Sequence, residues 1–106
     1  MTHAFTMKLL PGFQEEYKRR HDFIWPELEQ LLKNSGIKEY LIYLDESTGT
    51  LFGFQHLESN HSTADLPNDP VVKKWWAYMA DIMETNTDNS PVEGNLKEVF
   101  RLKTNL

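Results

Sequence analysis

Two extended stretches joined by a short turn restrict the folds open to this chain more than any other feature. Residues 37–45 and 50–57 are both rich in β-branched, aromatic and aliphatic side chains, which favour strands. Between them stands Glu46-Ser47-Thr48-Gly49, a run of residue types that is common in turns. The pattern predicts an antiparallel hairpin and therefore a sheet.

The predicted strand at residues 37–45 is apolar on both sides. Alternation places Tyr40, Ile42 and Leu44 on one face and Leu41 and Tyr43 on the other. We therefore expect both faces of this strand to be at least partly covered.

The amino-terminal third predicts one more strand, followed by helix. Apolar and polar residues alternate from Ala4 to Leu10, and Pro11-Gly12 ends the segment. An apolar stripe of helical spacing then runs over residues 13–34, interrupted by Pro26. Because proline lacks a backbone N–H and disfavours helical geometry in the preceding residue, we expect two helical segments with a bend between them. Ser35-Gly36 is a helix stop.

The carboxyl-terminal half supplies another helix and a last strand. Asp69-Pro70 resembles a helix cap followed by proline in the first turn, and it opens a predicted helix over Val71–Met83. Leu96–Leu102 has the pattern of a strand. The polar residues 84–95 form a long connection, which is more often a surface loop than a site but could close over a pocket.

The order of elements is thus β, α, β, β, α, β. This split arrangement predicts an α+β fold of the ferredoxin-like type, with the helices on one face of a four-stranded antiparallel sheet. A chain of 106 residues with 40% apolar and 25% charged residues fits a single domain over 1–106. A monomer of this size buries only about 60–70% of the surface that its unfolded chain exposes, so a subunit contact would add stability.

Charge and cysteine content narrow the partners and the compartment. The net charge of −5 argues against nucleic acids and anionic membranes, which bind through concentrated positive charge. The chain contains no cysteine, which excludes disulfides and thiolate chemistry and fits a reducing compartment. No window approaches the ~20 apolar residues of a membrane span, and no signal-peptide pattern is present. We therefore expect a cytoplasmic protein.

Tyr17 and His21 are the most informative candidates for chemistry, because they lie one helical turn apart. Steps of three or four residues continue to Ile24, Leu28 and Leu31, so the polar pair extends an apolar stripe and should face the interior. There an imidazole beside a phenol suits proton transfer. A lone histidine on an apolar face is more often a packing residue, and the phenol one turn away makes packing and function about equally good explanations.

Trp75 and Trp76 form a second candidate pair. Adjacent helix positions differ by about 100° around the axis, so both indoles cannot occupy the centre of one stripe. At least one should lie at the edge of the core or line a cavity, where it offers a flat apolar wall and an N–H donor. Tyr40 could point a hydroxyl into the space between sheet and helices. Simple packing explains all three residues equally well.

Phenols, an imidazole and indoles, without a nucleophilic cysteine or a cofactor motif, are typical of carbohydrate sites. Phenols can bond sugar hydroxyls, and indoles can stack on apolar C–H faces. The other histidines, His3, His56 and His61, lack the spacing of a metal site, and no segment resembles a zinc, calcium or nucleotide motif. We expect neither a metal nor a cofactor.

Several segments together resemble the L-rhamnose mutarotases, and they span nearly the whole chain in matching order and spacing. They are Tyr17-Lys-Arg-Arg-His21, Ile24-Trp-Pro-Glu-Leu28, Tyr43-Leu-Asp45, Lys74-Trp-Trp76 with Tyr78-Met79, and Asp88-Asn-Ser-Pro-Val92. The resemblance implies a dimeric α+β barrel that interconverts the α and β anomers of L-rhamnose without a cofactor. It also implies that His21 is the proton donor and that the sugar contacts Tyr17, Tyr40, Trp75 and Trp76.

The expected mechanism needs no bond to the protein. His21 protonates the ring oxygen or relays a proton to it, and the ring opens to an aldehyde that rotates and recloses. The base is left open, because water, a substrate hydroxyl, Tyr17 or a carboxylate such as Asp88 could act. Two rival functions remain, namely a haem-degrading or cofactor-independent monooxygenase on the same fold and a sugar-binding module without turnover.

Overall fold

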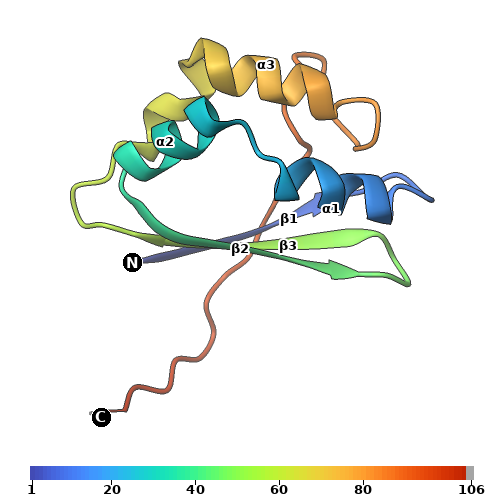
Figure 1. The fold of residues 1–106 in the computed structure, drawn as a ribbon. Helices are drawn as coiled ribbons and strands as arrows, with labels where there is room; N and C mark the ends of the chain where they lie inside the picture. Colours follow the sequence, from blue (N-terminus) through green and yellow to red (C-terminus); the bar gives the residue numbers. More distant parts are fainter. Residues whose placement is uncertain (105–106) are drawn as a thin grey trace.

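The computed structural model of the chain, which describes residues 1–104, has its helices on one side of an antiparallel sheet (Figure 1). The strands are β1 (Thr2–Lys8), β2 (Ile37–Asp45), β3 (Thr50–Leu57) and β4 (Gly94–Asn95). The helices are α1 (Gln14–Asp22), α2 (Pro26–Asn34) and α3 (Pro70–Met79), with a short 3₁₀ helix, η1, at Thr63–Asn68. The strand order is β2-β3-β1-β4 with antiparallel neighbours, which confirms the predicted ferredoxin-like α+β fold.

The position predicted for the last strand is wrong. Residues 96–102 form no strand, and β4 consists only of Gly94 and Asn95, which pair with Thr6 and Phe5 of β1. The Leu96 N–H still donates to the Ala4 carbonyl at 3.2 Å. The chain then leaves the edge of β1 and extends away from the sheet on the side opposite to the helices (Figure 1). An apolar extended pattern produces a strand only where a neighbouring backbone edge is within reach.

Other element ends differ by a few residues from the prediction. Strand β1 lies two residues earlier than expected, and residues 63–68 form η1 within a segment expected to be irregular. Helix α3 ends at Met79 instead of Met83, because the chain turns there and Met83 forms a bridge with Leu9. This turn places Ile82 and Met83 in the core.

The helix boundaries follow from local chemistry. Pro26 opens α2, and Trp25 before it is extended (φ −59°, ψ 129°), as the residue preceding a proline prefers. The Asp69 side chain caps α3 by accepting a hydrogen bond from the Val71 N–H at 2.8 Å. Gly36 follows α2 at φ +98°, and a Cβ at this position would lie 2.8 Å from the backbone of His61. The predicted bend between two helical segments is therefore confirmed.

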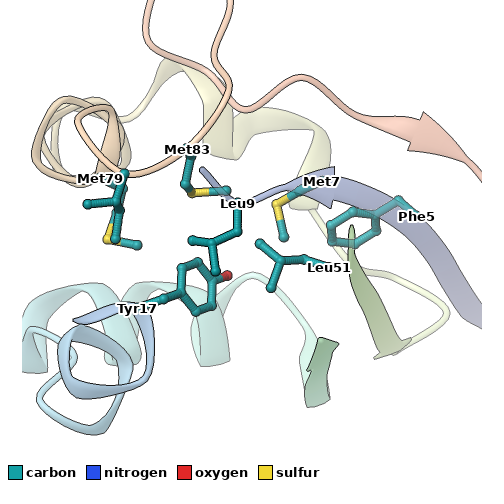
Figure 2. Packing of buried hydrophobic residues seen from close by; sticks show 8 residues of the cluster. Phe5, Met7, Leu9, Tyr17, Leu51, Met79 and Met83 are labelled. Carbon is teal, nitrogen blue, oxygen red and sulfur yellow. The ribbon is translucent and has the colours of Figure 1, made fainter. Parts of the chain in front are cut away.

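The hydrophobic core lies between the sheet and the helices. Its buried members are Phe5, Met7, Leu9, Tyr17, Leu51, Met79, Ile82 and Met83. Figure 2 shows the Tyr17 ring of α1 directed toward Leu9 and Leu51. Gly53 of β3 pairs with Phe5, and a Cβ there would come within 2.5 Å of the Phe5 ring. The bare backbone of Gly53 therefore lets this ring lie close against the sheet.

The opposite face of the sheet is uncovered within one chain. Tyr43 is 62% exposed and Leu41 is 38% exposed, although both were expected to be at least partly covered. The expectation is not met for Tyr43, since all the helices pack on the other face (Figure 1). Among the aromatic pairs of the described residues, the Tyr43 ring takes part in one, an edge contact with Phe54 at a centroid distance of 6.2 Å.

Candidate active site

A cavity of about 1140 Å³ lies between the sheet and the helices. All five residues that the sequence singles out for function line it, namely Tyr17, His21, Tyr40, Trp75 and Trp76. They come from α1, β2 and α3, so the fold brings together side chains that are far apart in the sequence. The cavity is at least as large as typical small-molecule sites, which leaves room for a monosaccharide.

The His21 imidazole is held at the cavity wall by contacts on two sides. Its Nδ1 lies 3.0 Å from the Tyr17 carbonyl oxygen. A carbonyl can only accept, so Nδ1 carries the proton and Nε2 is an acceptor in the neutral ring. The ring stacks on Tyr17 at a centroid distance of 4.2 Å and meets Trp75 edge-on at 5.4 Å. These contacts fix both the tautomer and the orientation of the ring.

The second ring nitrogen of His21 opens into the cavity. Within residues 1–104, Nε2 of His21 makes no hydrogen bond. Every fully buried side-chain nitrogen or oxygen in these residues has a partner, so Nε2 is not fully buried. Nε2 is therefore within reach of a ligand in the cavity. Burial lowers the pKa of His21 below its ordinary value, against a smaller opposing effect of the hydrogen bond to Tyr17. The ring is consequently neutral at pH 7, with a free lone pair on Nε2.

The two cavity phenols are neutral donors. Burial raises the pKa values of Tyr17 and Tyr40, and the two groups are close enough that a phenolate on Tyr40 would raise the pKa of Tyr17 further. Gln55, which pairs with Tyr40 across β2 and β3, opposes the shift of Tyr40 through a side-chain contact. Both hydroxyls therefore keep their protons at neutral pH, and Tyr17 is a poor general base.

Trp75 and Trp76 both line the cavity, but they pack differently. Trp75 belongs to an aromatic cluster with His21, Trp25 and Tyr78, with centroid distances between 5.1 and 5.6 Å, and it packs against the core. Trp76 appears in none of these ring pairs among the described residues and is partly buried at the cavity wall. The two indoles thus provide adjacent apolar surfaces.

A buried arginine anchors the helix that carries Tyr17 and His21. Arg20 of α1 is only 9% exposed and donates to Glu16 at 2.7 Å, to the Tyr78 carbonyl at 2.7 Å and to Asp81 at 2.9 Å. Its guanidinium also lies 4.4 Å from the centre of the Tyr78 ring. Arg20 therefore ties α1 to the end of α3, and the helical pattern did not predict its burial.

Three further polar residues of the cavity wall were missed by the sequence analysis. His3 of β1, Gln55 of β3 and Glu93, which precedes β4, all line the cavity. Strand alternation would have placed His3 and Gln55 on the face shared with Phe5 and Tyr40. Glu93 could not be placed, because the prediction put the last strand at residues 96–102.

The polar connection at residues 84–95 borders the cavity, and Thr85, Asn89 and Pro91 contribute to its lining. Thr85 and Pro91 form a β-bridge that makes the segment a compact turn. Asp88, considered as a possible base, is exposed and is not among the residues that line the cavity. Hydrogen bonds from Ser90 to its carboxylate lower its pKa, so Asp88 is poorly suited to accept a proton from a ligand.

The described part of the chain contains neither a cluster of metal ligands nor a membrane-spanning helix. No group of three or more histidine, cysteine, aspartate or glutamate residues within 1–104 could hold a metal ion. In the same residues, every helix is too short or too polar to cross a membrane.

The fold and the site define an α+β protein whose aromatic cavity has room for a small ligand beside one imidazole. The L-rhamnose mutarotase family model matches residues 2–102 of the chain. The chain is 60% identical over 100 residues to L-rhamnose mutarotase of Brucella anthropi, with 94% of each protein covered. It is 61% identical over 100 residues to that of Sinorhizobium fredii, with 94% of this chain and 96% of the relative covered.

A solved structure agrees with the sequence comparison. The crystal structure of an L-rhamnose mutarotase from Formosa agariphila matches with a TM-score of 0.91 and 52% identity, over 97% of this chain and 99% of that chain. The chain belongs to the L-rhamnose mutarotase family, as the resemblance of its motifs implied.

Proposed function

We propose that this protein interconverts the α and β anomers of L-rhamnose by proton transfer through His21. The observation that carries the proposal is the neutral imidazole with Nδ1 bonded to the Tyr17 carbonyl and Nε2 open to the cavity. Membership of the L-rhamnose mutarotase family supports the substrate and the reaction.

The protonation state of His21 sets the order of the steps. Neutral Nε2 first accepts the proton of the anomeric hydroxyl and then delivers a proton to the ring oxygen as the bond between C1 and that oxygen breaks. The product is the open-chain aldehyde. Rotation about the C1–C2 bond exposes the other face of the carbonyl, and the same proton transfers in reverse close the ring. His21 thus serves as base and acid in turn, and the proton moves from one sugar oxygen to the other.

The neighbouring residues orient the sugar in this proposal. The Tyr17 and Tyr40 hydroxyls, protonated because burial raises their pKa values, donate hydrogen bonds to sugar oxygens. The indoles of Trp75 and Trp76 pack against the apolar side of the ring and its methyl group.

Exchange spectroscopy tests the function directly. Saturation transfer between the two anomeric proton signals of L-rhamnose should increase on adding the cofactor-free protein at micromolar concentration. Binding of L-rhamnose with no change in exchange would instead identify a sugar-binding module. A Soret band on adding haem, without anomer exchange, would favour the monooxygenase.

The pH dependence of exchange follows from the lowered pKa of His21. Above its ordinary pKa of about 6.5 the ring is neutral, and the catalysed rate should be constant. Because burial lowers the pKa, the rate should fall only at a more acidic pH, where Nε2 becomes protonated and can no longer accept. The exchange rate measured from pH 4.5 to 8, corrected for the buffer reaction, checks this. A rate that rises on acidification would mean that imidazolium is the starting form.

We further propose that the protein is a homodimer whose subunits meet through the uncovered face of the sheet. Leu41 and Tyr43 are exposed on this face. The segment after β4 extends away from the sheet on the side opposite the helices (Figure 1), and within it Val99 is 89% and Phe100 78% exposed. Large exposed apolar side chains in such numbers suit an interaction site. In a two-fold symmetric dimer, the extended segment of each copy could pack on the sheet of the other. The proposed partner is therefore a second copy of this chain. The cytoplasmic location stays a prediction.

Substitution at Phe100 tests the dimer. Replacing it with aspartate (Phe100→Asp) should weaken dimerisation by about 10- to 100-fold, because the interface loses a buried aromatic side chain. Sedimentation velocity over a concentration series measures the effect. Phe23→Asp is the matched control, since Phe23 is 74% exposed but lies at the end of α1 on the helical side. Equal dimer populations in the two variants would contradict the proposed interface.

A further inference from the structure

A set of polar side chains on the sheet lines the cavity and takes no part in the proton transfer assigned to His21. The register of the sheet aligns His3, Gln55 and Tyr40 in one row across β1, β3 and β2. All three lie on the face that the helices cover, and all three line the cavity. The His3 ring stacks on Phe5 at a centroid distance of 5.0 Å, which holds it against the sheet.

Glu93 adds an acidic side chain to the same cavity wall. It directly precedes β4, where Gly94 pairs with Thr6 and Asn95 with Phe5. Since paired residues share a face and neighbours alternate, Glu93 lies on the same face as Phe5. It lines the cavity beside His3 and Tyr40, both of which are close enough to influence it or be influenced by it electrostatically.

The environment of Glu93 suits a ligand more than a structural contact. Within residues 1–104 its carboxylate forms neither an ion pair nor a hydrogen bond, and the residue lines the cavity. Surrounding protein atoms desolvate the carboxyl group and raise its pKa, with His3 opposing this in part. The side chain stays exposed to solvent in the single chain, so its carboxylate can exchange water for the hydroxyls of a ligand.

The side chains proposed to orient the sugar are all hydrogen-bond donors. Tyr17 and Tyr40 are protonated phenols, and the indole nitrogens of Trp75 and Trp76 can only donate. Sugar hydroxyls need acceptors as well as donors, and the Nε2 atom of His21 is committed to the anomeric centre. A carboxylate accepts two hydrogen bonds at once, which matches two neighbouring ring hydroxyls.

We propose that Glu93, with His3 beside it, contacts the substrate and determines specificity by accepting hydrogen bonds from ring hydroxyls away from the anomeric carbon. This inference rests on the proposed mutarotase function for the identity of the sugar. Its effect falls on sugar binding, and the chemical step is left to His21.

The test compares Glu93→Gln with Glu84→Gln, a matched control whose side chain is exposed like that of Glu93 but does not line the cavity. Isothermal titration with L-rhamnose gives Kd, and exchange spectroscopy over a range of sugar concentrations gives KM and kcat. Glu93→Gln should raise Kd and KM by about 10- to 100-fold with kcat changed less than about 3-fold. Glu84→Gln should match the wild type. His3→Ala should raise Kd in the same direction by a smaller factor.

L-Lyxose serves as a second probe, because it has the ring hydroxyls of L-rhamnose but lacks the methyl group. The affinity lost in Glu93→Gln should be the same factor for both sugars. An unchanged Kd, a fall in kcat at constant KM, or a loss confined to L-rhamnose would each overturn the proposal. If the wild-type protein binds L-rhamnose without accelerating exchange, the mutarotase function fails, while the titrations still decide whether Glu93 contacts the sugar.

Discussion

Replacing His21 with asparagine should reduce the catalysed anomer exchange of L-rhamnose by about 10²- to 10⁴-fold, toward the rate in buffer. Asparagine can still donate to the Tyr17 carbonyl, which His21 bonds through Nδ1, but it cannot carry a proton between two sugar oxygens. The loss should appear in kcat, because the tyrosines and tryptophans that we propose contact the sugar are unchanged. Saturation-transfer NMR on the folded variant measures it.

His56→Asn is the matched control for this experiment. His56 is 49% exposed on β3, where it lies 3.6 Å from Glu39 and does not line the cavity. Its variant should exchange the anomers at the wild-type rate. Wild-type exchange in His21→Asn, with an unchanged circular dichroism spectrum, would remove His21 from the mechanism.

Replacing Arg20 with methionine should lower the free energy of unfolding by about 2–3 kcal/mol. Hydrogen bonds that involve a charged group contribute about 1.5–3 kcal/mol, and the partly buried bond from Arg20 to the Tyr78 carbonyl would be lost. Methionine is unbranched and replaces the apolar stem of arginine without its guanidinium, so the loss reports mainly on the polar contacts. Urea unfolding at a fixed protein concentration measures the effect, because the stability of an oligomer depends on concentration.

Lys18→Met provides the comparison on the same helix. Lys18 also forms an ion pair, with Asp22 at 3.0 Å, but its side chain is 77% exposed. Exposed pairs contribute about 0–1 kcal/mol, so this variant should remain close to the wild type. Equal losses in the two variants would show that burial does not strengthen the Arg20 contacts.

The ion pairs of Glu16 with Arg19 and Arg20 should make the folded state less stable in acid. Hydrogen bonds from Arg19 and Arg20 lower the pKa of Glu16 from 4.5 to about 2. A lowered pKa stabilises the folded state above the unfolded value, and this contribution is lost as the pH falls from about 4.5 toward 2.

Much of the site could be predicted from sequence because it depends on local periodicity. Tyr17 and His21 are one helical turn apart, and Trp75 and Trp76 are adjacent on one helix, so helix geometry alone relates the members of each pair. Tyr40 follows from the two-residue period of β2. That all five residues line one cavity follows from the order of the strands and helices, which the sequence pattern predicted correctly.

The sequence by itself determined the α+β fold, the bend at Pro26, the cap at Asp69 and the identity of the aromatic and imidazole groups. The tertiary structure decided where the last strand lies, that Arg20 is buried, and that His3 and Glu93 join the cavity. The physical reason is that local patterns record the conformation of a segment and the side it buries. The backbone edge that a segment pairs with, and the charged groups that it contacts there, depend on residues remote in the chain, such as Arg20 and Asp81.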